Sequence, residues 1–286
     1  MIIIRNYRLL CCLLVLMSCT SQDFTMLEIA GDLPNSLNES SGVVNLRGSD
    51  NFWMINDSGN TNELFEVSET GAIQQIITVE NAKNKDWEDL ASDGRDNIFI
   101  GDFGNNNNKR KNLGIYTVAI SSIKNGKVKA VKTKFHFEDQ KKFPPKKKDR
   151  NFDVEAFVYA KGYFYLFTKN RSSEFNGITK LYKVPSQPGN HSAELIGSFE
   201  TCMDSKKCAI TAATISRNNE ELVLLTHDKL FLFTNFKGDD FFNGSVSEIN
   251  LYHDSQKEAV CFKGGTIYIT DEATKKSNGN LYRVVN

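Results

Sequence analysis

Five polar residues in this sequence could do chemistry together if the fold brought them to one place. They are Ser41, Glu88, Glu155, Thr211 and Glu258. Each opens a short apolar segment, and the intervals between successive members are 47, 67, 56 and 47 residues. Carboxylate and hydroxyl oxygens, with no His or Cys among them, are the ligands of a hard cation and not of zinc or copper. These residue types therefore predict a calcium site at which the five side chains converge.

Such a convergence would place three carboxylates close together. At about 5 Å and an effective dielectric constant near 20, each pair of like charges repels by roughly 3 kcal/mol. A bound cation would relieve this repulsion, and so would carboxyl protonation combined with ordered water. A structural plug that binds no ligand is a third interpretation. The sequence leaves these three alternatives open.

A second polar set follows the first at a nearly constant distance. Its members lie 13 to 16 residues after those of the first set, where strongly apolar segments end; they are Asp57, Asp102, Lys169, His227 and Asp271. This spacing is typical of a hairpin of two short strands, which brings the start of one strand beside the end of the other. We therefore expect the second set to surround the mouth of the site.

Several basic residues follow the same positions or belong to them. Arg110 and Arg171 follow the ends of two such segments and could bind a phosphate or carboxylate that is bridged to a cation. The alternative is that these long side chains are simply solvated. His227 could act as a general base, but no Ser or Cys nucleophile motif accompanies it, so no catalytic residue is assigned. The Lys-rich segment 141–150 is interpreted as a solvated loop.

The segments that carry these residues repeat along the chain and indicate its fold. Past residue 24, short apolar runs are broken every 8–12 residues by Gly, Asn, Asp or Ser, a pattern typical of an all-β fold. The repeat period matches four-stranded propeller blades. Residues 24–30 form an extra strand ahead of the first repeat, and the 28 residues after Glu258 suffice for three strands. We predict a five-bladed β-propeller whose last blade is closed by the N-terminal strand; a β-sandwich or another blade count is the alternative.

The polar residues that open the repeats resemble those of a known propeller family. Around five blades their order is hydroxyl, Glu, Glu, hydroxyl, Glu, which is similar to the calcium-activated nucleotidases (apyrases), whose central calcium is held by such residues. The resemblance covers only the five openers, and Thr211 stands where that family has Ser. It implies calcium as the cofactor and, as one option, calcium-dependent phosphohydrolase activity.

Four short phrases resemble a second and broader group of proteins. They are INDSG at 55–59, WEDL at 87–90, IGDFGN at 100–105 and DVEA at 153–156. Similar phrases occur in bacterial secreted β-propellers and lipoproteins, and this resemblance spans nearly the whole chain after the N-terminal segment. It supports the fold and implies no reaction.

The N-terminal segment resembles the signal peptide of a bacterial lipoprotein. Two Arg residues precede an apolar run over 9–17 that is too short to span a bilayer comfortably. The run leads to Ser18 and Cys19, which are similar to a lipobox, where the Cys becomes the acylated N-terminus. We therefore expect a signal peptide over 1–18, a palmitate-bearing tether over 19–23 and the propeller over 24–286. An ordinary secretory peptide with an incidental Cys is the alternative.

The other cysteines and the residue after Cys19 fit this location. Thr20 follows the Cys, as in outer-membrane cargo of Gram-negative bacteria, so we expect a lipid anchor on the outer membrane of the cell envelope. In an oxidising envelope, Cys202 and Cys208 are expected to form a disulfide across a polar loop, with two free thiols as the alternative. Cys261 is interpreted as an inert core residue.

Charge and motifs together suggest a class of function. Lys and Arg total 35, as do Asp and Glu, so there is no overall field to attract nucleic acid. The main hypothesis is a binding or scaffold module tethered to the envelope, with calcium in its central channel and a small polar ligand or protein partner at the mouth. The alternative is a calcium-dependent phosphohydrolase of the nucleotidase type.

Overall fold

The structure is a computed structural model that describes residues 26–285. Within these residues it contains 21 β-strands, four three-residue 3-10 turns and no α-helix. The all-β class expected from the apolar pattern is therefore confirmed. Among the same residues, no helix is long and apolar enough to cross a membrane. The predicted signal peptide (1–18), Cys19 and the tether (19–23) lie outside the described residues.

The first repeat forms a five-stranded sheet in the order β2-β3-β4-β5-β9. Its strands are β2 (Ser40–Val44), β3 (Phe52–Asn56), β4 (Glu63–Val67), β5 (Ile73–Val79) and β9 (Lys127–Val128). The first four pair antiparallel, and β9 adds to the outer edge parallel to β5. All five residues of β3 are buried, which explains their almost continuous apolar sequence FWMIN.

An eight-stranded sheet carries the next two repeats, in the order β6-β7-β8-β10-β14-β13-β12-β11. Its strands are β6 (Trp87–Ser92), β7 (Asn97–Asp102), β8 (Gly114–Ala119), β10 (Val131–Phe137), β11 (Asp153–Ala160), β12 (Tyr163–Lys169), β13 (Ile178–Pro185) and β14 (Gly189–Glu200). Two antiparallel groups of four strands are joined where β10 and β14 pair in parallel at their outer edges. The sheet is therefore continuous although it contains two repeats.

Two four-stranded sheets complete the described chain. One contains β15 (Ala212–Ile215), β16 (Leu222–Leu225), β17 (Lys229–Thr234) and β18 (Ser245–Asn250); the other contains β19 (Lys257–Lys263), β20 (Thr266–Asp271), β21 (Asn280–Val284) and β1 (Leu27–Asp32). The 3-10 turns are η1 (Asn35–Leu37), η2 (Ile120–Ser122), η3 (Lys147–Asp149) and η4 (Phe241–Asn243). The pairing of β1 with β21 joins the first and last described strands in one sheet.

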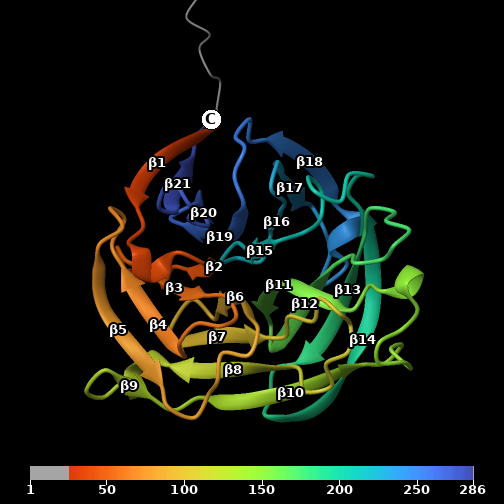
Figure 1. Ribbon diagram of the computed structural model, residues 1–286, viewed down its shortest axis with the longest axis horizontal. Coiled ribbons are helices and arrows are strands. Elements are labelled where there is room, and N and C mark those ends of the chain that lie inside the picture. The colour runs from red at the N-terminus through yellow and green to blue at the C-terminus, as the bar shows by residue number, and fades with distance from the viewer. Residues whose placement is uncertain (1–25, 286) are drawn as a thin grey trace, which may run out of the picture.

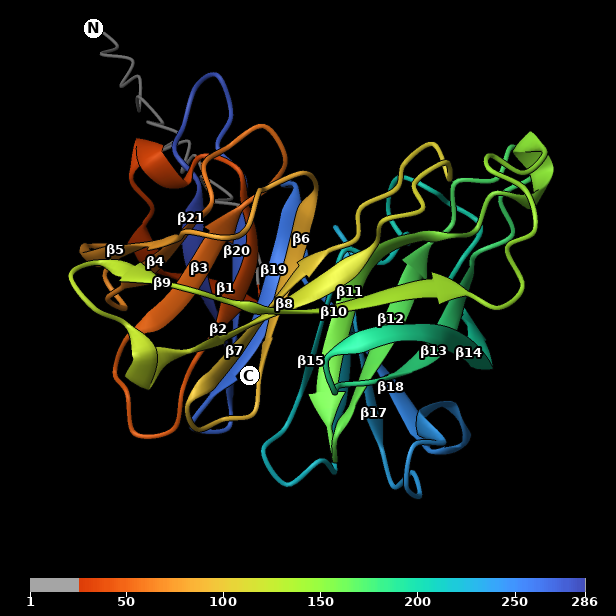
Figure 2. The same cartoon turned by 90° about the horizontal axis from the view of Figure 1, so that it is seen from below.

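The sheets surround a common axis, with one strand of each four-stranded group at the centre (Figure 1). The central strands are β2, β6, β11, β15 and β19; each contacts the next in this order, and β19 contacts β2. Connecting loops gather at both ends of the strands in the side view (Figure 2). Apolar side chains fill the space between neighbouring sheets; Ile55 of β3 and Ile100 of β7, for example, share one core cluster with Trp87. Each sheet is thus held by its neighbours, and the central strands are fixed around the axis.

Candidate functional site

The five residues that open the sequence repeats line one cavity at an end of the axis. The cavity has a volume of about 220 Å³, and its wall contains Ser41, Glu88, Glu155, Thr211 and Glu258. Six further residues complete the lining: Asp57, Asn106, Lys169, Arg171, Gln256 and Glu272. Four of the five openers lie on central strands, and the fifth directly precedes β15. The repeat therefore brings its polar openers together.

β-Bulges in the central strands lie at most of the five polar openers. The register between a central strand and its neighbour shifts at four of the five openers, namely Ser41, Glu88, Glu155 and Glu258. A bulged residue is left out of the ladder, and the strand bends locally, so its side chain can be re-aimed. Thr211 reaches the same cavity without a bulge because it lies just outside the regular pairing of β15. The local backbone thus departs from regular strand geometry where polar groups must face the axis.

Glu155 is the carboxylate whose charge the protein itself neutralises. Its Oε2 accepts a hydrogen bond from Lys169 Nζ at 2.9 Å, and its Oε1 accepts one from Arg171 at 2.6 Å. Arg171 also donates to Asp153 at 2.6 Å. Burial alone would raise the pKa of Glu155, but the two cations outweigh burial and hold that pKa below its ordinary value. The sequence reasoning missed this internal neutralisation as a way to relieve the repulsion.

Glu88 and Glu258 have no Lys or Arg partner of this kind among the described residues. Glu88 is 7% exposed, and no described residue hydrogen-bonds its carboxylate. Burial, followed by the charge of Glu155, raises the pKa of Glu88 well above its ordinary value. Burial also raises the pKa of Glu258 to about 8, and the nearest basic group in its vicinity is His227, whose Nε2 lies 3.9 Å from Glu258 Oε1. An added positive charge would favour the ionised form of both carboxyls.

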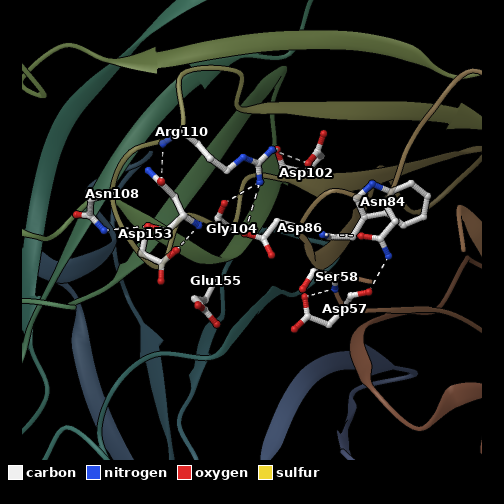
Figure 3. A network of polar contacts seen from close by, with 12 residues as sticks. Asp57, Ser58, Asn84, Asp86, Asp102, Gly104, Asn108, Arg110, Asp153 and Glu155 are labelled. Carbon is white, nitrogen blue, oxygen red and sulfur yellow. Dashed lines mark hydrogen bonds and ion pairs between the residues drawn. The ribbon is translucent and has the colours of Figure 1, made fainter. Parts of the chain in front are cut away.

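Glu88 also belongs to a tighter group of carboxyls at the edge of the cavity. One oxygen each from Asp57, Asp86 and Glu88 lies within 4.8 Å of the other two. Figure 3 shows Asp86 close to the turn that carries Asp57. Burial raises the pKa of Asp57 to about 6 and raises that of Asp86 as well. Gly104 leaves room for this group, because a Cβ there would collide with Glu88 Oε1 and with the carboxyl group of Asp86.

Ser41 and Thr211 tie neighbouring central strands together at the cavity. Ser41 Oγ donates to the carbonyl oxygen of Trp87 at 3.2 Å, and Thr211 Oγ1 donates to that of Lys257 at 2.8 Å. Each acceptor belongs to the next central strand, β6 or β19. A hydroxyl that donates its hydrogen keeps its lone pairs, so both oxygens remain available as acceptors.

Three of the five residues expected at the mouth lie at the cavity. Asp57 and Lys169 are part of its wall, and His227 lies beside Glu258. Burial, followed by the charge of Lys169, lowers the pKa of His227 to about 4, so its imidazole is neutral at pH 7. Its Nδ1 is buried without a hydrogen-bond partner among the described residues.

The other two expected mouth residues are directed into their own sheets and do not line the cavity. Asp102 is fully buried and forms ion pairs with Arg110 at 2.7 Å and with Lys132 of β10 at 2.9 Å. Asp271 accepts a hydrogen bond from the hydroxyl of Tyr282 in β21 at 2.8 Å. In both cases the partner on an outer strand draws the carboxylate away from the axis.

Both arginines considered as anion contacts are already ion-paired. Figure 3 shows the guanidinium of Arg110 between Asp102 and Asp86; its NH1 lies 3.6 Å from Asp86, and it also donates to the carbonyl of Gly104 at 2.7 Å. Arg171 is held by Asp153 and Glu155. Arg171 therefore lies in the cavity wall with its guanidinium engaged by carboxylates, and Arg110 lies outside the lining.

Two acidic residues of the site escaped the sequence reasoning. Asp86 lies two positions before Glu88, and Glu272 directly follows the mouth residue Asp271. Burial, followed by the charge of Asp57, raises the pKa of Glu272 to about 7. Both residues are carboxylates next to the repeated polar positions, and this proximity in sequence could have identified them.

Away from this site, Cys202 and Cys208 form a disulfide, and Cys261 is buried and free.

Comparisons with known proteins support the fold. No family model matches the chain, and no curated protein matches it either. Among solved structures, the PQQ-bound aldose sugar dehydrogenase from Streptomyces coelicolor is similar, with a TM-score of 0.52 at 9% identity over 90% of this chain and 97% of that one. A glucose dehydrogenase gives a TM-score of 0.51 at 8% identity over 91% and 99% of the two chains. The chain therefore has a β-propeller fold, and at this identity the likeness concerns the fold alone.

Proposed function

We propose that the sheets form five blades and that the N-terminal strand closes the ring. The eight-stranded sheet is counted as two blades, because its two antiparallel halves meet only at the outer edge strands β10 and β14. Five central strands in cyclic contact support the count, and the pairing of β1 with β21 supports the closure. In this interpretation each blade contributes one polar opener to the cavity.

We further propose that the protein is a binding or scaffold module that holds a calcium ion in the acidic cavity. Glu88 carries this proposal, because it is more than nine-tenths buried, has no partner among the described residues and lies against Asp57 and Asp86. The cavity wall has five carboxyls and two cations, a net charge of −3 when all are ionised. Oxygen ligands and net negative charge suit a hard divalent cation.

Glu88 belongs to both possible ligand sets. One is the ring of openers on the axis, Ser41, Glu88, Glu155, Thr211 and Glu258; the other is Asp57, Asp86 and Glu88. The ion pairs of Glu155 with Lys169 and Arg171 weaken the first set, since a carboxylate already engaged by two cations is a poorer ligand. In the second set, Asp86 has a single and longer contact with a cation, at 3.6 Å from Arg110, and Asp57 accepts a hydrogen bond from the backbone N–H of Ser58. We therefore favour a cation at Asp57, Asp86 and Glu88.

Calcium-dependent stabilisation tests this proposal. Calcium added to chelator-treated protein is expected to raise the melting temperature, and Glu88→Gln is expected to abolish the rise. Asp86→Asn should abolish it too, whereas Glu258→Gln should abolish it only if the ion lies on the axis. Glu200→Gln, on an exposed part of β14, is the matched control. If calcium, magnesium and manganese all leave the melting temperature unchanged, no cation site exists here.

The nucleotidase-type phosphohydrolase has weaker support. A phosphate bridged to the cation would need positive groups at the mouth, but Arg110 and Arg171 are paired with carboxylates. His227 is the only imidazole beside the cavity among the described residues, and no described Ser, Thr or Cys side chain hydrogen-bonds its ring as a nucleophile would. Calcium-dependent release of phosphate from nucleoside di- or triphosphates, lost in Glu88→Gln, would establish this alternative against a purely binding role.

The location is proposed from the N-terminal sequence. We propose a lipid anchor at Cys19 and an envelope location, and the Cys202–Cys208 disulfide supports an oxidising compartment. Incorporation of labelled fatty acid should disappear in Cys19→Ala, and label that persists would rule out lipidation at this residue.

A further inference from the structure

A second cavity lies at the opposite end of the central strands. It has a volume of about 240 Å³ and is lined by the ends of these strands and the turns that follow them. Four basic residues are part of its wall: Arg47, Arg95, Lys161 and Arg217. Among residues 26–285, Asp93 is the only acidic residue in the lining, so the described wall carries a net charge of +3. The charge at this end of the axis is opposite to that of the acidic cavity.

The four cations have no acidic partner among the described residues. Neither Arg47, Arg95 nor Lys161 forms a side-chain hydrogen bond or ion pair there, and Arg217 donates only to the amide oxygen of Asn45, at 3.1 Å. Each cation comes from the turn after a different central strand, β2, β6, β11 or β15. The four side chains are exposed, and their turns surround one cavity, so the cavity wall presents positive charges that no described carboxylate neutralises.

Asp93 does not neutralise this group because its carboxylate is used within its own turn. Its Oδ1 accepts hydrogen bonds from the backbone N–H groups of Arg95, Asp96 and Asn97 at 2.9, 3.1 and 3.1 Å. Its Oδ2 accepts a further one from the side chain of Asn97 at 2.7 Å. The carboxylate therefore holds the turn, and the guanidinium of Arg95 stays free.

Lys161 occupies an unusual backbone conformation at this cavity. It lies in the two-residue turn between β11 and β12, with φ of 50°, and the next residue, Gly162, has φ of 86°. Positive φ at both central positions favours Asn-Gly, and a side chain such as Lys is strained there. A strained residue with an unpartnered charge at a cavity is typical of a functional position.

We propose that this basic cavity binds a small, multiply charged anion that carries phosphate or carboxylate groups. Three guanidinium groups present planar pairs of N–H donors, which match the oxygens of carboxylates and phosphates. The limited volume suits a small anion better than a polymer.

Asp89 lies between the two cavities. Its carboxylate accepts hydrogen bonds from the backbone of Leu90 at 2.8 Å and of Phe157 at 3.0 Å and so links two blades. The anion site is therefore distinct from the acidic cavity.

Calorimetric titration of the full chain with inorganic pyrophosphate, and separately with citrate, tests the proposal. We expect saturable binding of at least one probe, and the probe that binds more tightly identifies phosphate or carboxylate as the preferred group. Arg47→Gln/Arg95→Gln should weaken binding by about tenfold or more, because each lost charge-assisted hydrogen bond contributes on the order of one such factor. Both residues are exposed, so the substitutions should not affect folding.

Two further variants make the result decisive. Lys161→Asn should also weaken binding while keeping or raising the melting temperature, because Asn tolerates the left-handed backbone. Lys206→Gln/Lys207→Gln removes two exposed charges elsewhere and should leave binding unchanged. Absence of saturable binding in the unmodified protein, or equal weakening by the control pair, would overturn the proposal. Glu88→Gln should retain anion binding, so failure of the calcium proposal can be distinguished from failure of the anion proposal.

Discussion

Glu88 combines a repeated sequence position, an irregular backbone and an unfavourable electrostatic environment. It opens the second repeat, lies at a β-bulge of β6 and is buried against two further carboxyls. A buried carboxylate without a partner is costly, which explains the direction of its pKa shift. Protonation or a bound cation relieves this cost, and only a bound cation makes stability depend on calcium.

Gly104→Ala is expected to eliminate calcium-dependent stabilisation. The added Cβ would occupy the space of Glu88 Oε1 and press on the carboxyl of Asp86, so the ligand group would be displaced. Because Gly104 does not have a positive φ, the backbone itself tolerates Ala. Thermal unfolding with and without calcium checks this, with Gly94→Ala as a contrasting variant that perturbs a turn outside the acidic cavity. Full calcium stabilisation in Gly104→Ala would contradict the proposed ligand set.

Glu258→Gln is expected to change how stability depends on pH. The folded pKa of Glu258 is about 8, above the ordinary value of 4.5, so between these values the folded protein keeps a proton that the unfolded chain has released. Stability therefore falls as pH rises through this window, and Gln removes that contribution. As the pH rises from 5 to 8, the free energy of unfolding of the variant should increase by roughly 1–3 kcal/mol relative to that of the unmodified protein. Denaturant unfolding in chelator at several pH values measures this; parallel pH curves would show that Glu258 titrates normally.

At the scale of elements, the strand pairs were predictable and the bulges were not. Apolar runs and turn residues located the hairpins, such as β11 with β12, because these signals are local in sequence. The register shift at Glu155 has no comparable signal. Nor could the sequence indicate that Lys169 would turn toward Glu155 while Asp102 would turn toward Lys132. Lys169 and Asp102 both follow the opener of their repeat by 14 residues, so the spacing does not distinguish their side-chain directions.

The pairing of β1 with β21 is expected to contribute strongly to stability. Glu28 and Arg283 are direct partners in this pairing and form an ion pair at 2.6 Å. Cysteines in their place, Glu28→Cys/Arg283→Cys, should form a disulfide, since directly paired antiparallel residues lie within bridging distance. The oxidised variant should be more stable than its reduced form by about 2–4 kcal/mol. Failure to oxidise would indicate that the two strands do not meet in solution.

At the scale of the whole molecule, equal numbers of acidic and basic residues conceal two opposite local charges. The total charge of zero correctly describes the chain, yet the charged residues that line one end of the axis are mainly carboxylates and those that line the other are mainly Arg and Lys. The acidic end could be predicted because its residues recur at the same place in each repeat. The basic end could not, because Arg47, Lys161 and Arg217 lie in turns of different length, where no common spacing marks them.

Direct measurement of bound calcium is the most direct test of the central claim. Equilibrium dialysis of chelator-treated protein against calcium, followed by elemental analysis, counts the ions bound to each chain. The account predicts one saturable ion per chain in the unmodified protein and none in Glu88→Gln, with Glu200→Gln unchanged. No bound ion, or an equal amount in Glu88→Gln, would contradict it.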